Sequence, residues 1–224
     1  MARLPIIAVL AALGAALGWP TPGPTFTPAS AQEEVLALPS LPPPSGGSFS
    51  LIDHTGRQVA DADFRGSYLL VYFGYIFCPD VCPTGMQMLT EAVEILGDAG
   101  TKVQPIFITV DPERDGLEAL ADYVGAFHPR LVGLTGTPKQ IKAVAKAYGA
   151  RYFKLYYPPS WDDEEEESEN GEEGEESLDY AMNHTAFTYL LGPDGRGLAT
   201  FPHGAWPQDM ALEIRGFIED ETGE

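Results

Sequence analysis

The stretch Tyr68–Gln87, YLLVYFGYIFCPDVCPTGMQ, joins a strand, a loop with two cysteines and the start of a helix. Its first part, Tyr68–Tyr75, is almost continuously apolar, which is typical of a strand buried on both faces. Thr84 and Gln87 have the spacing of a capping box, so we predict that a helix begins at Thr84. The two thiols therefore lie between a buried strand and a helix N-terminus.

Cys78 and Cys82 are the only two cysteines of the chain. A structural cross-link would stabilise the fold more by closing a long loop, so the pair indicates a chemical role. A helix N-terminus favours thiolates, and thioredoxin active sites have this architecture with one residue fewer between the cysteines. Two sulfurs lie about 2.05 Å apart in a disulfide and roughly 4 Å apart on one metal ion. The spacing alone leaves thiol exchange and metal binding open.

His184 is the candidate for a third member of this site. It lies in DYAMNHTAFTYLL, residues 179–191, just before a predicted strand. In a thioredoxin-like sheet the loop at this place packs against the cysteine loop, so we expect the imidazole beside the thiols. The other histidines are interpreted as structural or exposed: His54 in a hairpin turn, His128 at a helix end and His203 between a proline and a glycine.

Two thiolates and one imidazole form a soft set of metal ligands. Structural zinc sites have four protein ligands, whereas Cu(I) accepts three and binds sulfur well. Cu(II) would complete its coordination with a water or a carboxylate. The residue types therefore favour copper, as Cu(I), Cu(II) or both.

The flanking sequence alternates strand and helix patterns, which indicates an α/β fold with helices flanking a central mixed sheet. It begins with a predicted N-terminal β-hairpin, Phe49–Asp53 and Gln58–Ala60, around the turn HTGR. Further strands are predicted at Val103–Val110, Arg151–Tyr157, Thr185–Leu191 and Leu198–Phe201. Further helices are predicted after the caps Asp115 with Glu118 and Thr137 with Gln140, and at Pro207–Asp220.

The N-terminal segment, residues 1–31, contains the apolar run Leu4–Gly18. This run is short for a spanning helix, which needs ~20 residues, and fits the apolar region of a secretory signal. A retained membrane anchor is the alternative. Residues 32–48 are rich in proline, glycine and serine and are interpreted as a tether. Both alternatives predict an exported, periplasmic domain, held at the inner membrane if the run is retained.

The formal net charge of −20 excludes nucleic acid as a partner, because phosphates demand lysine and arginine. Eleven of the 33 acidic residues lie in Asp162–Glu176, DDEEEESENGEEGEE, which contains no basic residue. This acidic insertion is interpreted as a solvated, disordered loop. The alternative is electrostatic steering toward a basic partner, an effect that salt would weaken.

Three stretches of the chain resemble the hallmark stretches of the Sco/SenC family of copper-handling proteins, in the same order. They are GYIFCPDVCPTGMQ (74–87), ITVDPERD (108–115) and DYAMNHTAFTYLLGPDG (179–195), and the similarity covers residues 49–220 outside the acidic insertion. The resemblance implies a thioredoxin-like domain over residues 49–220, with copper bound by Cys78, Cys82 and His184. It also implies a metallochaperone that assists assembly of the dinuclear copper centre of cytochrome c oxidase. Its partner would be a copper-receiving oxidase subunit or another copper chaperone.

Members of this family pass on copper, reduce the cysteines of their target, or do both. The alternative function is therefore a thiol–disulfide oxidoreductase that uses Cys78 and Cys82 as a redox-active pair, so enzyme status stays open. A thiol peroxidase is disfavoured, because peroxide-reducing relatives of this fold have a threonine where this chain has Tyr75.

The chain departs from the family pattern on both sides of the histidine. Asn183 and Thr185 stand in place of the usual aspartate and serine. Asparagine removes a negative charge that is expected near the metal. Asp111, in the DPERD stretch, has two interpretations: a group close to the metal centre, or the cap of a turn after a buried strand.

Overall fold

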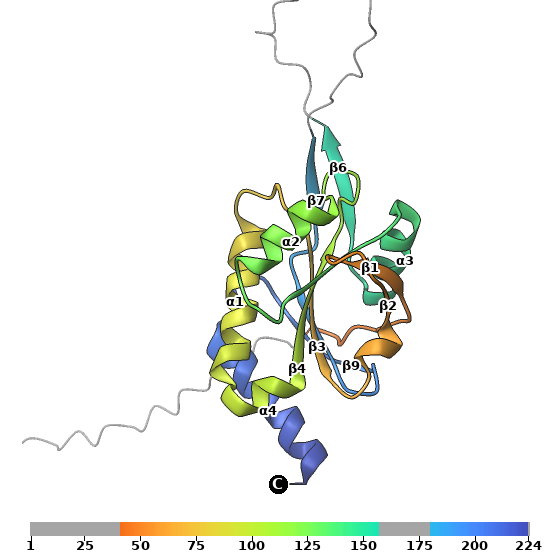
Figure 1. Cartoon of the computed structure of the whole chain (residues 1–224). Coiled ribbons are helices and arrows are strands. Elements are labelled where there is room, and N and C mark those ends of the chain that lie inside the picture. Colours follow the sequence, from red (N-terminus) through yellow and green to blue (C-terminus); the bar gives the residue numbers. More distant parts are fainter. Residues whose placement is uncertain (1–40, 157–179, 224) are drawn as a thin grey trace, which may run out of the picture. The chain divides into compact units, whose positions relative to one another are not determined.

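The computed structural model describes residues 41–156 and 180–223. In these residues, strands form one sheet in the order β2-β1-β5-β4-β3-β8-β9 and a separate pair, β6–β7 (Figure 1). The strands are β1 (Ser50–Asp53), β2 (Gln58–Ala60), β3 (Tyr68–Gly74), β4 (Val103–Thr109), β5 (Val132–Thr135), β6 (Tyr152–Tyr156), β7 (Tyr180–His184), β8 (Thr188–Leu191) and β9 (Gly197–Phe201). The helices are α1 (Val81–Ile95), α2 (Leu117–Gly125), α3 (Pro138–Tyr148) and α4 (Pro207–Thr222), with short 3-10 turns at Asp61–Phe64 and Gly97–Lys102.

The central strand β3 is buried along its whole length, as its apolar sequence predicts. It pairs in parallel with β4 and antiparallel with β8. The hairpin β1–β2 joins the same sheet through β5, and β8–β9 forms its other edge. The predicted mixed sheet with an N-terminal hairpin is therefore confirmed.

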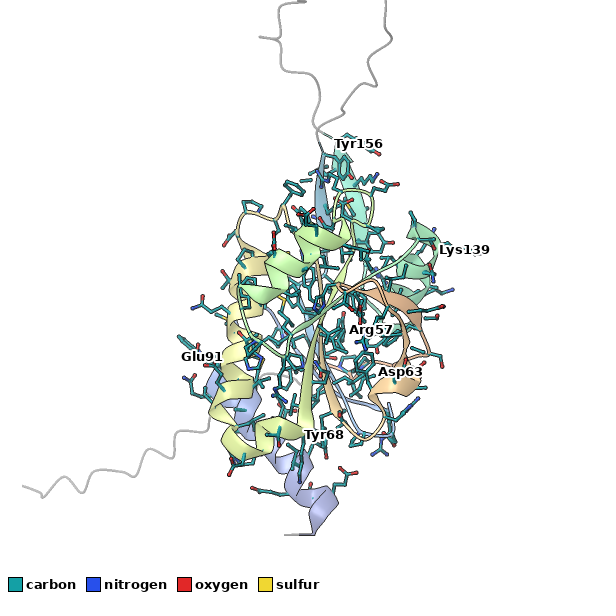
Figure 2. All side chains as sticks on the ribbon, viewed as in Figure 1. Arg57, Asp63, Tyr68, Glu91, Lys139 and Tyr156 are labelled. Atoms are coloured by element: carbon teal, nitrogen blue, oxygen red, sulfur yellow. The ribbon has the colours of Figure 1, made fainter. Side chains whose placement is uncertain are left out.

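Helices cover both faces of this sheet. In Figure 1, α1 and α4 lie on one side of β3 and β4, and α3 lies on the other. The helix α3 packs its apolar face inward, where Ile141, Val144, Ala145 and Tyr148 are all buried. Figure 2 shows side chains filling the space between helices and sheet, while Glu91 and Lys139 point outward.

The strand β7 was not predicted as a strand. Tyr180–His184 pairs antiparallel with β6, and His184 lies opposite Tyr152 in the register. The sequence predicts His184 in a loop, because a five-residue strand with mixed polarity has little period-2 signal. The short strand β5 was also missed.

Two predicted helix starts are wrong. The helix α1 begins at Val81, with Asp80 as its N-cap, so Cys82 is in its first turn. Pro83 is tolerated there because the first N–H groups of a helix have no partner within it. The N-cap of α2 is Gly116. The side chain of the preceding Asp115 instead accepts hydrogen bonds from Thr109 and Ile76. The capping box of Thr137 and Gln140 on α3 is confirmed.

The last residues of the proline-rich segment lie against the domain. The hydroxyl group of Thr200 donates a hydrogen bond of 2.9 Å to the carbonyl oxygen of Pro42, and Pro44 is buried. The acidic insertion and residues 1–40 lie outside the described residues. Within the described ranges, no helix has the length and apolar character needed to cross a membrane.

Candidate metal centre

The two thiols lie where β3 passes into α1. Cys82, in the first turn of α1, is fully buried, and Cys78, in the preceding loop, is 7% exposed. The backbone N–H of Cys82 points at the sulfur of Cys78, 3.4 Å away. Gly74, at the end of β3, leaves room for the inner thiol, since a Cβ atom there would lie 2.9 Å from the Sγ of Cys82. Both cysteines are free thiols.

His184 ends β7 and faces the thiols. Its Nε2 atom lies 3.1 Å from the Sγ of Cys82, and its Nδ1 atom lies 3.3 Å from the carbonyl oxygen of Thr185. A carbonyl oxygen can only accept, so Nδ1 carries the proton and the lone pair of Nε2 points toward the sulfur. The rings of Tyr72 and Tyr75 meet the imidazole edge-on and fix its plane.

The three ligand atoms form a compact group. The sulfurs of Cys78 and Cys82 and a ring nitrogen of His184 all lie within 4.8 Å of one another. Ligands bound to one metal at ~2.3 Å for sulfur and ~2.0 Å for nitrogen stand roughly 3.6 to 4 Å apart. Small side-chain movements would therefore bring all three to one soft metal ion.

Burial determines the protonation states of Cys82 and His184 in the metal-free protein. Burial raises the pKa of the Cys82 thiol, which overturns the expectation that the helix N-terminus would make it a thiolate. Burial also lowers the pKa of His184. Both groups are therefore neutral near pH 7. A bound cation reverses the preference of the thiol, because its positive charge stabilises the thiolate.

The other histidines are not part of this group, as predicted. The Nδ1 of His54 accepts the N–H of Gly133 at 3.1 Å, and the Nδ1 of His128 accepts the N–H of Arg130 at 3.0 Å. His203 is exposed. Among the described residues, Cys78, Cys82 and His184 are the one group of His, Cys, Asp and Glu residues close enough to hold a metal ion.

Asp111 lies in the turn after the buried strand β4 and bonds Arg114 of the same turn, as the second of its two interpretations expects. Its carboxylate accepts the hydroxyl group of Tyr180 at 2.8 Å and the Nε of Arg114 at 2.5 Å, so it binds the start of β7 rather than the thiols. Asp115 accepts the hydroxyl group of Thr109 at 2.5 Å and the N–H of Ile76 at 3.1 Å. Burial raises the pKa of Asp115 to about 6.

The contact between Arg114 and Tyr180 is not among the features that the sequence predicts. The available signal was the alternation of Tyr180, Met182 and His184, which places these side chains on one face of a strand. Asn183 lies on the opposite face, and its side chain is exposed.

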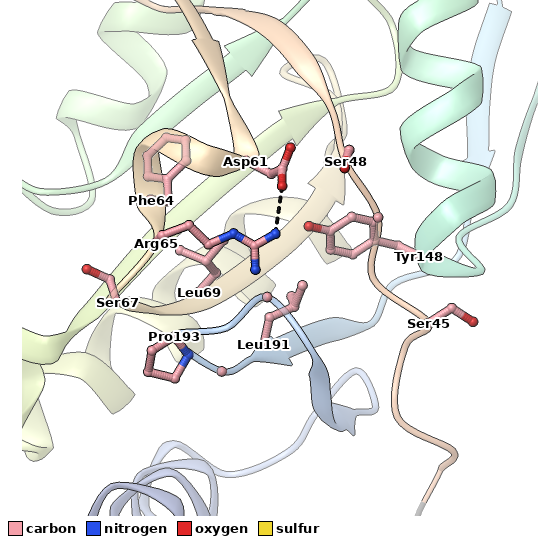
Figure 3. Close-up of a pocket in the computed structure, with 13 residues that line it drawn as sticks. Ser45, Ser48, Asp61, Phe64, Arg65, Ser67, Leu69, Tyr148, Leu191 and Pro193 are labelled. Atoms are coloured by element: carbon pink, nitrogen blue, oxygen red, sulfur yellow. Dashed lines mark hydrogen bonds and ion pairs between the residues drawn. The ribbon is translucent and has the colours of Figure 1, made fainter. Parts of the chain in front are cut away.

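A separate pocket lies at the other end of β3 (Figure 3). It has a volume of about 200 Å³, and no cysteine or histidine lines it. Arg65 and Asp61 form an ion pair of 2.9 Å at its wall, and the buried hydroxyl group of Tyr148 points toward them. This pocket is therefore distinct from the candidate metal centre.

Comparison with known proteins shows the family to which the chain belongs. The family model SCO1/SenC matches residues 39–219. The chain belongs to the SCO1/SenC family. It is 41% identical over 171 residues to the human protein named "Protein SCO1 homolog, mitochondrial", covering 75% of this chain and 51% of that protein. The chain spans about half the length of several curated relatives that it matches.

Two solved structures named ScoI are similar in fold. ScoI from Arabidopsis thaliana, solved with copper bound, has a TM-score of 0.64 and 32% identity and covers 77% of this chain and 99% of that one. ScoI from Bradyrhizobium japonicum, also with copper bound, has a TM-score of 0.63 and 35% identity, covering 77% and 98%. The expected thioredoxin-like fold and the resemblance to Sco/SenC proteins are confirmed.

Proposed function

We propose that this SCO1/SenC domain is a copper metallochaperone. It binds one copper ion through the sulfurs of Cys78 and Cys82 and the Nε2 of His184, and it delivers the ion to a copper-receiving subunit of cytochrome c oxidase. The observation that carries the proposal is the convergence of these three ligand atoms within 4.8 Å. The copper-bound relatives support it. Three soft ligands suit Cu(I) as the cargo, and Cu(II) would need a further oxygen ligand.

The residues of the site have separate tasks in copper binding. Cys78 is the more accessible of the two thiols, so it is the contact point for a donor or acceptor of copper. Cys82 holds the ion from the interior, and His184 closes the set from β7 with its lone pair already directed inward. Each thiol releases its proton when it binds the cation.

Thiol–disulfide exchange is the second candidate, because both cysteines are free and adjacent. In this reaction the two thiols would be oxidised to a disulfide while a disulfide of the partner is reduced to two thiols, so two electrons and two protons pass to the partner. Cys78, the more accessible thiol, would attack first, and the buried, protonated thiol of Cys82 would be slow to close the disulfide. We therefore rank this reaction second.

Anaerobic copper titration of the reduced protein separates the two functions. We expect the wild type to bind one Cu(I) per chain, His184→Ala to bind it much more weakly, and the Cys78→Ser/Cys82→Ser double variant to lose the site. Thermal unfolding of each metal-free variant serves as the control for folding. Equal copper affinity of wild type and His184→Ala would overturn the three-ligand site. Normal disulfide reduction by His184→Ala would favour the redox function.

We also propose that the domain acts after export to the periplasm, with the apolar run Leu4–Gly18 as signal or anchor. This run lies outside the described residues. Fractionation of cells that make the full chain would test the assignment. Recovery of the protein from the cytoplasm would contradict it.

A further inference from the structure

The strand that carries His184 is not part of the central sheet. Among the described residues, β7 pairs with β6 alone, whereas the cysteine loop follows β3 in the central sheet. A two-stranded hairpin is marginally stable in water by itself. Contacts from outside the hairpin must therefore fix where β7 lies relative to the thiols.

Several of these contacts surround Tyr180, at the other end of β7. The guanidinium carbon of Arg114 lies 3.7 Å from the centroid of the Tyr180 ring, and the ammonium nitrogen of Lys154 lies 4.4 Å from it. Arg114 also donates a hydrogen bond of 2.8 Å to the carbonyl oxygen of Tyr180. The hydroxyl group of Tyr180 donates to Asp111, and Lys154 forms an ion pair with Glu113. The ring, the hydroxyl group and the backbone carbonyl group of Tyr180 therefore each have a partner.

The same turn also holds the cysteine loop. The guanidinium carbon of Arg114 lies 5.5 Å from the ring centroid of Phe77 and 5.9 Å from that of Tyr75, within the range of cation–π contacts. Its neighbour Asp115 accepts the N–H of Ile76 at 3.1 Å. The turn after β4, DPERD, therefore contacts both halves of the metal centre without supplying a ligand.

We propose that Asp111, Arg114 and Tyr180 form a positioning clamp for the metal centre. The clamp holds β7 against the turn after β4, and β7 holds His184 beside the thiols. Tyr180 and His184 lie on the same face of β7, four residues and roughly 13 Å apart. The clamp therefore acts on the metal through the placement of a strand. This inference rests on the proposed copper-binding function.

Three variants of the clamp and one matched control test it in the full chain. Arg114→Gln removes the cation and the contacts of its guanidinium group, and Tyr180→Phe removes only the hydrogen bond to Asp111. Arg196→Gln makes the same change of charge at an exposed arginine whose partner Asp194 is 4.0 Å away. In competition with a Cu(I) chelator, we expect Arg114→Gln to bind copper about 10- to 100-fold more weakly, since groups that orient metal ligands have effects of this size. The copper affinity of Tyr180→Phe should be a few-fold lower than that of wild type, and that of Arg196→Gln should equal it. Arg114→Lys keeps the positive charge, so its copper affinity should lie between those of Arg114→Gln and wild type.

A double-mutant cycle shows whether the effect passes through His184. In a His184→Ala background, Arg114→Gln should lower copper affinity much less than in wild type, because the ligand that β7 positions is gone and only the contacts of Arg114 with the cysteine loop remain. An equal loss in both backgrounds would overturn the proposal, as would wild-type affinity of Arg114→Gln.

The metal-free protein gives a readout that does not depend on copper. Arg114→Gln should shift and broaden the NMR signals of the His184 ring, while those of His54 remain as in wild type. Broadening together with failure of the wild type to bind copper would leave the clamp standing and reject the proposed function. Unchanged His184 signals would reject the clamp.

Discussion

The Nε2 of His184 lies 3.1 Å from the Sγ of Cys82, although 102 positions separate the two residues in the chain. This separation is slightly shorter than the roughly 3.6 to 3.8 Å that a sulfur and a nitrogen span on one metal ion. In the metal-free protein the pair is therefore linked as thiol and imidazole. A copper ion held by both atoms would take the place of the thiol proton, and Cys82 would bind it as a thiolate.

Copper should stabilise the reduced protein through this group. A ligand that binds only the folded state stabilises it by about 3 kcal/mol when its free concentration is a hundredfold above its Kd. We expect thermal unfolding with chelator-buffered Cu(I) to show a rise in Tm for wild type, and removal of the metal by excess chelator to reverse it. The double-cysteine variant is the control. An equal rise in that variant would place the stabilising copper elsewhere.

Gly74→Ala should disturb the inner thiol. The added Cβ would lie 2.9 Å from the Sγ of Cys82 and 2.9 Å from the ring of Phe107, in a fully packed region. Overpacking of this kind costs about 1 to 3 kcal/mol, which urea unfolding would measure, and copper affinity should fall as Cys82 is displaced. Gly125→Ala is the matched control, because a Cβ there has open space. A fully stable Gly74→Ala variant with normal copper affinity would contradict the packing argument.

Asp53 should make stability depend on pH. Burial alone would raise the pKa of this carboxyl group, but hydrogen bonds from Thr55 and Arg57 together lower it to about 2. Because the folded-state pKa lies below the unfolded value of about 3.9, the ionised group stabilises the fold above pH ~4 by about 2 kcal/mol. This contribution is lost as the pH falls from about 4 toward 2.

The variant Asp53→Asn measures this contribution. In urea unfolding it should be less stable than wild type by about 2 kcal/mol at pH 7, and the difference should shrink below pH 4. Asp122→Asn, at an exposed position, is the control and should change stability little at any pH. A difference between Asp53→Asn and wild type that stays constant down to pH 2.5 would refute the assignment.

Asn183→Asp, which restores the usual family residue, should affect copper affinity little. The side chain is exposed and lies on the face of β7 opposite His184. At a separation of roughly 7 Å or more through water, the added charge is worth about 0.6 kcal/mol or less, which is under threefold in affinity. Competition titrations with Cu(I) and Cu(II) check this. A tenfold gain for either ion would show that the charge acts through a path other than solvent.

Much of the fold could be predicted from local sequence. The unbroken apolar run of β3 predicted a buried central strand, and the capping box of Thr137 and Gln140 predicted where α3 begins. Helix starts were predicted less well. Thr84 has the residue pattern of an N-cap, but the N-cap of α1 is Asp80. The helix can begin before Pro83, because a proline is tolerated in the first turn. Short strands such as β7 depend on pairing partners, so their sequences carry little signal.

The sequence by itself determined the chemistry available to this protein: two adjacent thiols after a buried strand, and histidines that can complete a soft metal site. Only the tertiary structure decided how close His184, the histidine that the sequence singles out, comes to the thiols, and that the turn after β4 contacts its strand. The physical reason is distance along the chain. Apolar periodicity and helix caps act over a few residues, whereas contacts across 102 positions, such as that between Cys82 and His184, depend on how the separate hairpin β6–β7 packs.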